Sequence, residues 1–258
     1  MEQPLISIIT PSFNQAKWLE TCILSVLNQN YSNFEYIIID GGSTDESVSI
    51  IKKYEDKLAY WQSKPDGGQA KALNIGYKKA KGQIIAYLNA DDCYEPGCFE
   101  SVVRTYEVNQ EYAIYYGKCK TIDAEGNLLH EGQGDQIKFS KLLKDGMLPH
   151  MFQPACFFNH RYLNREYFIN EKFNLAFDYE LILSLAQQKS ILFLNRDFAS
   201  YRVHKDSKSQ KLAKEAYKEK LSIQQQFSKG DFLLWQWRKL KFNIADKTGH
   251  FAKNKAAL

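Results

Sequence analysis

The part of the chain up to Asp92 alternates short apolar runs, rich in β-branched residues, with segments of helical periodicity. The runs predict strands, and the periodic segments predict helices, in the order Leu5–Thr10 (strand), Trp18–Leu27 (helix), Phe34–Ile39 (strand), Glu46–Tyr54 (helix), Leu58–Gln62 (strand), Gln69–Ala80 (helix) and Ile84–Leu88 (strand). Strands joined through a helix lie parallel in one sheet, because right-handed crossovers dominate such connections. We therefore expect an α/β fold with a mixed, mostly parallel sheet flanked by helices.

Beyond Pro96 the alternation becomes less regular. Strand-like runs separated by short turns predict antiparallel pieces in the same sheet. The expected strands are Ala113–Gly117, Cys119–Ile122, Leu128–Leu129, Pro154–Phe158 and Ile191–Leu194. The expected helices are Phe99–Val108, Phe139–Lys144, Phe177–Ala186 and a surface helix over Ser207–Phe227, with a polar loop over Tyr201–Ser207.

The composition is that of an ordinary globular protein. The 258 residues are 44% hydrophobic and 25% charged, and the formal net charge is +4. This charge is small for the length, so no nucleic-acid-binding face is predicted. In the C-terminal part, residues 232–242 combine tryptophans with clustered cations, a composition suited to a membrane interface. Packing of this segment on the body of the protein, or on a second subunit of a homo-oligomer, explains it equally well.

The cysteines and the lack of long apolar runs indicate the compartment. Five cysteines, with no signal-peptide-like segment before the first strand, favour a reducing cytoplasm. Cys93 and Cys98 have no second Cys or His pair at zinc spacing, so no structural zinc site is expected. No apolar run reaches the roughly 20 residues of a membrane-spanning helix. We expect a cytoplasmic protein, peripheral on the inner face of the plasma membrane if the C-terminal segment binds lipid.

Polar residues follow three of the predicted strands at the point where each strand ends. Because the carboxyl ends of parallel strands share one edge of a sheet, these side chains converge on one crevice. They are Ser12, Asn14, Asp40, Asp45, Asp91 and Asp92. The adjacent Asp91 and Asp92 repel each other unless they face water or share a divalent cation. A solvated turn and a cation site are both compatible with this segment alone.

Four segments carry motifs in a fixed order. They are Ser-Ile-Ile-Thr-Pro-Ser-Phe-Asn-Gln at Ser7–Gln15, Asp-Gly-Gly-Ser-Thr-Asp at Asp40–Asp45, Pro-Asp-Gly-Gly-Gln at Pro65–Gln69 and Leu-Asn-Ala-Asp-Asp at Leu88–Asp92. Together they resemble the inverting family 2 glycosyltransferases with the GT-A fold, of the type that builds bacterial surface polysaccharides. The resemblance runs from Leu5 to about Ser209. It implies a Rossmann-like nucleotide-sugar half at about 1–98 and an acceptor half at about 99–209, leaving 210–258 as a helical, basic and aromatic extension.

The resemblance implies a donor site at the strand ends. Asp40 would bond the nucleobase, since a carboxylate can accept from a pyrimidine N–H, and the loop after the first strand would flank the same nucleotide. Asp40 could instead cap the following helix, and Lys71 could simply face water. The donor-binding residues implied before the fourth motif are Pro11, Ser12, Asn14, Asp40, Asp66 and Lys71.

Asn89-Ala90-Asp91 resembles the DXD motif of the family, whose last acid reaches a Mg²⁺ or Mn²⁺ on the donor diphosphate. Asn89 replaces the first acid of that motif, and its amide could bond a ribose hydroxyl instead. Asp91, Asp92 and, by resemblance, His204 would hold the metal, because carboxylates and imidazole suit Mn²⁺.

Asp178, at the predicted start of a helix, matches the position of the family's catalytic base. Phe177 stands where many relatives have Glu, and a lone acid at a helix N-terminus often only caps the helix. The place of Asp178 in the series of motifs favours the base, and at an ordinary pKa of about 3.9 it would be ionised at neutral pH. Arg202 and Lys205 could neutralise the departing diphosphate, although exposed cations are more often solvated.

These residues predict an enzyme that moves a sugar from a nucleotide diphosphate sugar, UDP-linked, to a hydroxyl of a saccharide or lipid-linked saccharide. The expected transfer is metal-dependent and inverts the sugar carbon. Nucleotidyltransferases and dinucleotide dehydrogenases would need a Gly-rich loop after the first strand, and Thr10–Asn14 has none. Because of Asn89 and Phe177, a non-catalytic nucleotide-sugar-binding or scaffold protein with the same fold stays open.

Overall fold

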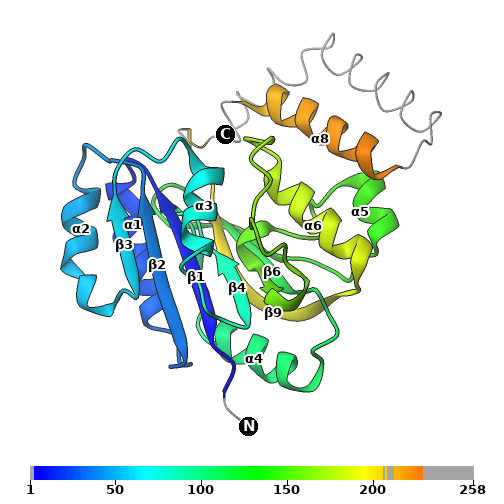
Figure 1. The fold of residues 1–258 in the computed structure, drawn as a ribbon, viewed down its shortest axis with the longest axis horizontal. Coiled ribbons are helices and arrows are strands. Elements are labelled where there is room, and N and C mark those ends of the chain that lie inside the picture. The colour runs from blue at the N-terminus through cyan, green and yellow to red at the C-terminus, as the bar shows by residue number, and fades with distance from the viewer. Residues whose placement is uncertain (1–2, 206, 208–211, 229–258) are drawn as a thin grey trace.

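The computed structural model describes residues 3–205, 207 and 212–228. Its centre is one sheet with the strand order β3-β2-β1-β4-β8-β6-β9-β5, in which β7 also pairs with β6. Helices lie on both faces of this sheet, as Figure 1 shows. The prediction of an α/β fold with a mixed, mostly parallel sheet is confirmed.

The N-terminal half forms the parallel part of the sheet. Its strands are β1 (Ile6–Ser12), β2 (Phe34–Asp40), β3 (Tyr60–Ser63) and β4 (Ile84–Tyr87), each parallel to its neighbours within this half. They are connected by α1 (Ala16–Leu27), α2 (Ser47–Lys53), the 3-10 turn η1 (Glu55–Lys57) and α3 (Gln69–Tyr77). The loops that leave the carboxyl ends of these strands therefore lie along one edge.

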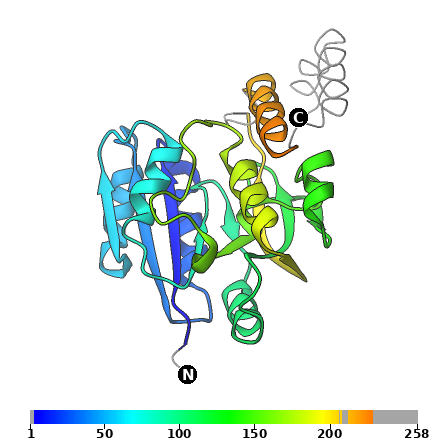
Figure 2. The same ribbon diagram turned by 45° about the vertical axis from the view of Figure 1, so that its right-hand side comes forward.

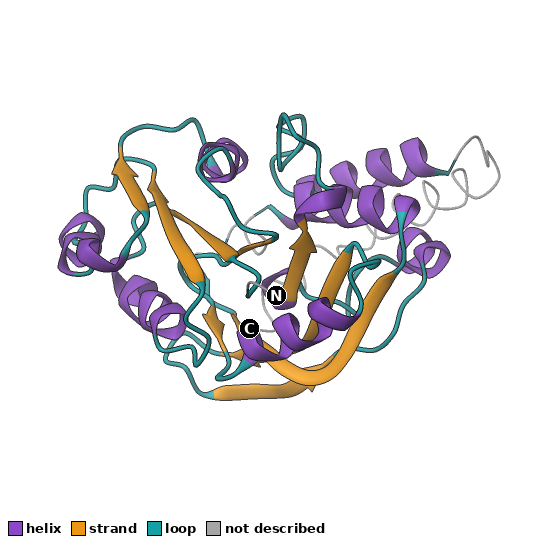
Figure 3. Cartoon of the chain, turned by 60° about the horizontal axis from the view of Figure 1, so that its bottom comes forward, coloured by secondary structure: helices purple, strands orange, loops and turns teal. Residues whose placement is uncertain are grey.

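The C-terminal half adds antiparallel strands. β8 (Cys156–Asn159) runs antiparallel to both β4 and β6 (Ile114–Ile122), whereas β9 (Ile191–Arg202) runs parallel to β6. The short β5 (Cys93–Tyr94) and β7 (Leu128–Gln133) pair antiparallel with β9 and β6. The strands do not lie in one plane but curl, as expected of a twisted sheet (Figure 3). The remaining elements are α4 (Cys98–Val108), α5 (Phe139–Asp145), η2 (Gln153–Ala155), η3 (His160–Tyr162), α6 (Phe177–Gln188) and α8 (Ala213–Phe227).

Alternate residues of β1 pack on opposite faces of the sheet. Ile8 belongs to the core cluster that contains Leu19 of α1, and Ile9 belongs to the cluster that contains Leu73 of α3. All four side chains are fully buried, and each buried aliphatic side chain stabilises the fold by about 1.5–3 kcal/mol. Helix α3 approaches β1 closely at Gly76, where a Cβ would lie 2.5 Å from Ile9 Cγ2. This packing fixes the helices that follow the loops at the sheet edge.

Two segments of the C-terminal half differ from the expectation. Residues 113–117 and 119–122 form one strand, β6, instead of two. The strand expected at Ile191–Leu194 continues to Arg202, so Tyr201 and Arg202 lie in β9 and not in a loop. Its polar residues 195–197 hide this continuity in the sequence. In the structure, an irregular register between β6 and β9 accommodates them and restores pairing as far as Arg202.

Helix α8 is shorter and more buried than the predicted surface helix. It begins at Ala213, and its residues Ile223 and Gln224 are buried. Gln224 Nε2 donates to the carbonyl oxygen of Leu143 at 2.9 Å, and the Phe227 ring meets that of Phe139 edge-on. Figures 1 and 2 show α8 beside α5 and α6. The helix is therefore docked on α5 and α6 of the C-terminal half.

Residues 229–258 lie outside the described residues, and with them the segment 232–242 for which membrane or subunit contacts were expected. Among the residues that the structure describes, no helix combines the length and the apolar character needed to cross a bilayer. The five cysteines are free thiols. Cytoplasmic location, lipid binding and a homo-oligomer stay predictions from the sequence.

Candidate active site

A cavity of about 930 Å³ lies at the carboxyl ends of the parallel strands. Its walls on one side are the loops that follow β1, β2, β3 and β4. On the other side they are the segment around η2, the start of α6 and one face of α8. The cavity therefore joins the two halves that the sequence predicted, and α8 takes part in it.

Hydrogen bonds join the loops after β1 and β2. The backbone N–H of Asn14 donates to Ser43 Oγ at 2.8 Å, and Asn14 Oδ1 accepts from the Thr44 N–H at 2.9 Å. Asn14 has φ of 52°, which Asn adopts more readily than most residues. Pro11 and Ser12 line the cavity, and Ser12 Oγ is buried without a hydrogen-bond partner among the described residues. Asn14 thus supports the loop after β1, and Ser12 presents a polar atom to the cavity that a ligand could bind.

Asp40, which was expected at the nucleobase, is fully buried at the end of β2. Its Oδ2 accepts from the N–H groups of Gly42 and Ser43 at 3.1 and 2.8 Å and from Ser63 Oγ at 2.6 Å. Its Oδ1 accepts from Ser43 Oγ at 2.5 Å. The carboxylate therefore organises the loop after β2, and in the described structure it is Gly41 that lines the cavity there. A contact of Asp40 with a nucleobase stays a prediction.

The loop after β3 brings a carboxylate and a cation to the cavity. Asp66 lines it, and Asp66 Oδ1 accepts from the Gly68 N–H at 2.7 Å. Gly67 and Gly68 have φ of 81° and 113°, so this turn requires glycine at both positions. Lys71 is exposed, and its Nζ would lie 3.2 Å from a Cβ on Gly67. Both expected donor-binding side chains thus lie at or beside the rim.

Asn89, Ala90 and Asp91 follow β4 and all line the cavity. Asn89 Oδ1 accepts from Gln69 Nε2 at 2.8 Å, and Asn89 Nδ2 donates to Asp92 Oδ2 at 3.2 Å. An amide can accept on one side and donate on the other, which a carboxylate cannot do. The replacement of the first acid by Asn89 therefore suits the buried Asp92 beside it.

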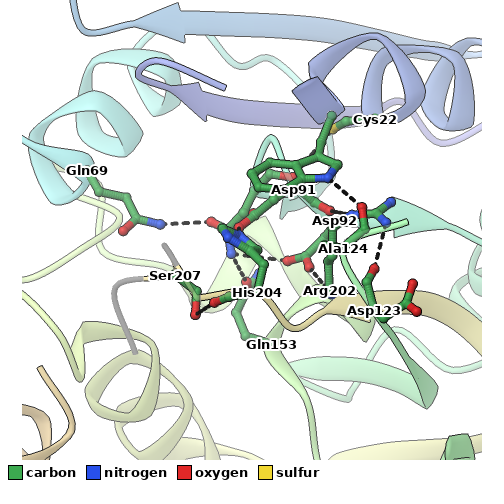
Figure 4. A network of polar contacts seen from close by, with 12 residues as sticks. Cys22, Gln69, Asp91, Asp92, Asp123, Ala124, Gln153, Arg202, His204 and Ser207 are labelled. Carbon is green, nitrogen blue, oxygen red and sulfur yellow. Dashed lines mark hydrogen bonds and ion pairs between the residues drawn. The ribbon is translucent and has the colours of Figure 1, made fainter. Parts of the chain in front are cut away.

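The imidazole of His204 lies against the carboxylate of Asp91, with Nε2 2.9 Å from Oδ2 (Figure 4). The ring of Trp18 packs on this imidazole at 4.1 Å between centroids, and Trp18 Nε1 donates to the carbonyl of Ala124 at 2.9 Å. His204 is buried, and its Nδ1 has no hydrogen-bond partner among the described residues. The structure thus brings together two of the three expected metal ligands.

Asp92 has a different environment from Asp91. It is fully buried, and its Oδ1 accepts from the backbone N–H of Arg202 at 2.9 Å. Burial, reinforced by the neighbouring Asp91 carboxylate, raises the pKa of Asp92 well above its usual value. With hydrogen bonds on both oxygens, Asp92 joins β9 to the loop after β4 and is not among the residues that line the cavity.

The two cationic residues expected at the diphosphate, Arg202 and Lys205, differ in their environments. Arg202 is 4% exposed, and its guanidinium donates to the carbonyl oxygens of Asp91 at 2.8 Å and Asp123 at 2.9 Å and to Cys93 Sγ at 3.8 Å. It braces the loop after β4 and does not line the cavity. Lys205 is exposed next to His204. Of the two, Lys205 is the one placed to meet an anion from solvent.

The chemistry of Asp91 and His204 fits a divalent cation whose shell a substrate completes. A carboxylate oxygen and an imidazole nitrogen suit Mn²⁺, and Mg²⁺ at such sites takes further ligands from phosphates and water. Within residues 3–205, 207 and 212–228, no group of three or more His, Cys, Asp or Glu could hold a metal by itself. The pair would therefore hold a cation together with the oxygens of a bound diphosphate.

Asp178 lies in the first turn of α6 and lines the cavity. Burial among protein atoms raises its pKa to about 6, although a hydrogen bond from the Tyr179 N–H at 2.7 Å acts in the opposite direction. The pKa is thus higher than the ordinary value expected from the sequence, and the carboxylate is a stronger base. Phe177 is buried, with its ring 6.4 Å from that of Tyr87, so it is a packing residue.

Several residues in or near the cavity were not recognisable in the sequence. Trp18 occupies an apolar position of α1, and only the return of β9 places His204 on its ring. Gln153 Nε2 donates to the Tyr87 carbonyl at 2.8 Å and lines the cavity, as do Tyr217 and Lys220 of α8. Gln69 directly follows Pro65–Gly68 at the start of α3, and this motif was a sequence signal for it. Gln153 lies in the segment that faces the acceptor in related enzymes, but no role could be assigned to it from the sequence. No local feature marked Trp18, Tyr217 or Lys220.

A parallel N-terminal half, a mixed C-terminal half and one cavity lined by both define the GT-A fold class. Solved structures share this fold. S. aureus TarS 1-349 in complex with UDP-GlcNAc superimposes with a TM-score of 0.67 at 16% identity, covering 84% of this chain and 66% of that chain. The mannosyltransferase PcManGT from Pyrobaculum calidifontis, in complex with GDP-Man and Mn²⁺, superimposes with a TM-score of 0.64 at 15% identity, covering 86% and 63%.

Residues 7–168 match the family described as Glycosyl transferase family 2. The chain belongs to this family. It is 30% identical to the chondroitin synthase of Pasteurella multocida (strain Pm70), over 80% of this chain and 21% of the relative. It is also 30% identical to an uncharacterized glycosyltransferase of Rickettsia bellii (strain RML369-C), over 81% and 31%. The chain thus spans only about a fifth to a third of the length of these relatives.

Proposed function

We propose that this protein transfers a sugar from a UDP-sugar to a hydroxyl group of a saccharide or lipid-linked saccharide, with inversion, during the synthesis of a cell-surface polysaccharide. The observation that carries the proposal is that Asp91 and Asp178 line one cavity, and that the Asp91 carboxylate forms a pair with His204 behind it, 2.9 Å from Oδ2 to Nε2. The pair can hold a cation that binds a diphosphate, and Asp178 can accept a proton from the acceptor. These are the two chemical tasks of a single-displacement transfer.

The walls on the donor side support nucleotide binding. Ser12 Oγ and Gln15 Oε1 are both buried without partners among the described residues, and both residues line the cavity. An unpaired buried polar atom costs about 1–3 kcal/mol, which a ligand hydrogen bond would offset. Asp66 and Lys71 at the rim could reach the same ligand.

The relatives and fold neighbours support the choice of donor and product. TarS was solved with UDP-GlcNAc, and two Pasteurella relatives are named chondroitin synthase and hyaluronan synthase, which are polysaccharide-forming activities. PcManGT was solved with GDP-Man and Mn²⁺, so a GDP-sugar is the alternative donor to be compared.

Asp178 would act as the general base. At neutral pH a carboxyl group with a pKa of about 6 is mostly ionised, and a base with a pKa near the working pH is effective. It would take the proton from the acceptor hydroxyl as that oxygen attacks the anomeric carbon, and one displacement inverts that carbon. When bound at Asp91 and His204, a divalent cation supplies Lewis-acid stabilisation of the charge on the departing diphosphate.

Buried residues would keep the site in shape. Asp92 and Arg202 tie the loop that carries Asp91 to β9, and Asn89 ties it to α3 through Gln69. Asp40 holds the loop after β2, which packs beside the donor side of the cavity. Preorganisation of this kind means that the cation and diphosphate bind without reordering the loops.

A donor panel tests the function. The protein is incubated with UDP-hexoses, UDP-N-acetylhexosamines and GDP-mannose, with Mn²⁺ or with EDTA, and nucleotide release and the anomeric form of the product are followed by NMR. We expect release from at least one UDP-sugar with Mn²⁺ only, and inverted product. Binding of nucleotide sugars without any release would identify a scaffold protein, and a retained anomer would exclude the proposed single displacement.

A further inference from the structure

Helix α8 lies beyond the residues that match the family, yet it forms a wall of the cavity. The match ends at residue 168, whereas Ala216, Tyr217 and Lys220 of α8 line the cavity. The fully buried Ile223 anchors the helix in the same hydrophobic core as α6. Helix α8 is therefore placed to act on the chemistry at the start of α6, which also lies beyond the matched residues.

Glu219 of α8 accepts hydrogen bonds from three consecutive backbone N–H groups. Its Oε2 lies 2.9 Å from the nitrogens of both Leu175 and Ala176, and the Asn174 nitrogen lies 3.0 Å from Oε1 and 3.1 Å from Oε2. These residues directly precede α6, and the capping residue Ala176 has no side-chain acceptor of its own. A carboxylate at this end of a helix satisfies free N–H groups and interacts favourably with the helix dipole.

The turn that Glu219 holds is the one that leads into Asp178. Asp178 Oδ1 accepts from the N–H of the next residue, Tyr179, so the direction of its carboxylate follows the backbone of this turn. Tyr179 is fixed from α8 as well, because Gln224 Nε2 donates to its hydroxyl at 3.2 Å. Helix α8 thus holds both sides of Asp178.

We propose that Glu219 is a positioning residue that fixes the first turn of α6 and thereby aims the Asp178 carboxylate into the cavity. The inference rests on the proposed role of Asp178 as the base. It extends the active site to α8, which, like α6, lies beyond the matched residues 7–168. Loss of the Glu219 contacts should therefore affect the chemical step and leave donor binding intact.

The charges around Asp178 influence its pKa, so the pH profile of kcat is a readout that a purely structural role of Glu219 would not change. The titratable groups that act on it are Tyr87 of β4, Cys156 of β8 and Glu219 and Lys220 of α8. Burial raises the pKa values of the Tyr87 hydroxyl and the Cys156 thiol well above their usual values, so both are neutral. Burial is also the main cause of the raised pKa of Asp178, to which Glu219 adds and which Lys220 opposes.

Three variants of α8 test the inference. Glu219→Gln removes the charge and one of the two acceptor oxygens; Glu219→Asp keeps the charge but shortens the reach; Glu215→Gln makes the same change at an exposed position of the same helix. We expect kcat to fall roughly ten- to a hundredfold in both Glu219 variants, with the donor KM unchanged, because small misplacements of a base are costly. Glu215→Gln should match the wild type. In Glu219→Gln alone, the acidic limb of the kcat profile should move to lower pH.

Hydrogen exchange tests the same contacts without any substrate. In the wild type the amides of residues 174–176 should exchange slowly, and in Glu219→Gln they should exchange faster while those of the β1 core do not change. Unchanged exchange at residues 174–176, or wild-type kcat in Glu219→Gln, would overturn the inference. A different result would show that Asp178 is not the base. In that case Asp178→Asn would keep the wild-type turnover, whatever the Glu219 variants show.

Discussion

His204 Nε2 lies 2.9 Å from Asp91 Oδ2, although 113 residues separate the two in the chain. The contact forms because β9 pairs with β5, with Ser200 opposite Cys93, and so returns to the loop that carries Asp91. The loop after β4 and the end of β9 thus meet at one point, where Trp18 of α1 packs on the imidazole. Both halves of the protein are needed to build the Asp91–His204 pair.

Turnover should fall as the pH drops through about 6. Burial raises the pKa of Asp178 to about 6, and a protonated carboxyl group cannot accept a proton from the acceptor. Below this value kcat should decrease about tenfold per pH unit. The check is kcat at saturating donor and Mn²⁺ across this range, with circular dichroism to show that the protein stays folded. A constant kcat down to about pH 4.5 would mean that the base has an ordinary carboxyl pKa.

Ionisation of the Asp178 carboxyl group should also lower the free energy of unfolding at neutral pH. The folded-state pKa of Asp178, about 6, exceeds the ordinary 3.8, so the folded protein holds this proton more tightly than the unfolded chain. Ionisation therefore costs stability as the pH rises through this window, and Asp178→Asn avoids the cost. Relative to the wild type, the variant should gain on the order of 3 kcal/mol between about pH 4 and pH 6, and little more above it.

Urea unfolding of the wild type and of Asp178→Asn at several pH values measures this gain in the free energy of unfolding. Asn can still accept the hydrogen bond from Tyr179, so the pH-dependent part of the difference reports the ionisation. In the same variant kcat should fall about 10²-fold or more, with donor affinity spared. A stability difference that does not change with pH would place the Asp178 carboxyl in a water-like environment.

The sequence predicted the fold and the loops of the site, but not where each side chain points. Strand runs, glycine turns and family motifs are local signals; of the residues they single out, Ser12, Asp66, Asp91 and Asp178 line the cavity. Asp40 is of the same residue type as three of these and ends a strand, yet its oxygens turn toward the N–H groups of its own loop. Backbone donors within a few residues compete with a ligand for a carboxylate, and only the folded geometry decides between them.

Contacts between distant segments were the other limit. Asp92 and Arg202 are 110 residues apart, and their hydrogen bond follows from the continuation of β9 past the polar residues 195–197. Likewise, nothing near Glu219 in the sequence shows that it meets the start of α6. Such long-range pairs depend on packing of whole elements, which residue patterns along the chain do not specify.

Arg202→Lys should destabilise the protein rather than weaken nucleotide binding directly. A lysine has no planar fork that could bond the carbonyls of Asp91 and Asp123 together. Leaving buried acceptors unpaired should lower the free energy of unfolding by on the order of 1–3 kcal/mol. The exposed Lys205→Gln should change it by less than about 0.5 kcal/mol. If Arg202→Lys keeps full stability in urea but loses UDP affinity, Arg202 contacts the diphosphate after all.

Asn89→Asp, which restores the acid of the family motif, should be destabilising in this protein. The change removes the donor that bonds Asp92 Oδ2 and places a second carboxylate beside a fully buried one. The expected loss is on the order of 1–3 kcal/mol at neutral pH, and it should shrink on acidification. Thermal unfolding at two pH values measures both effects. Full stability together with tighter Mn²⁺ binding would instead show that position 89 faces the metal.

The central claim is that Asp91 and His204 hold a cation that in turn holds the nucleotide diphosphate. Calorimetric titration of UDP into the wild type, Asp91→Asn and His204→Gln, each with Mn²⁺ and with EDTA, tests it most directly. In the wild type Mn²⁺ should tighten UDP binding by about tenfold or more, a gain of about 1.4 kcal/mol, and in both variants this gain should disappear. Equal UDP affinity of the wild type with and without Mn²⁺, or a metal effect that survives in Asp91→Asn, would contradict the claim.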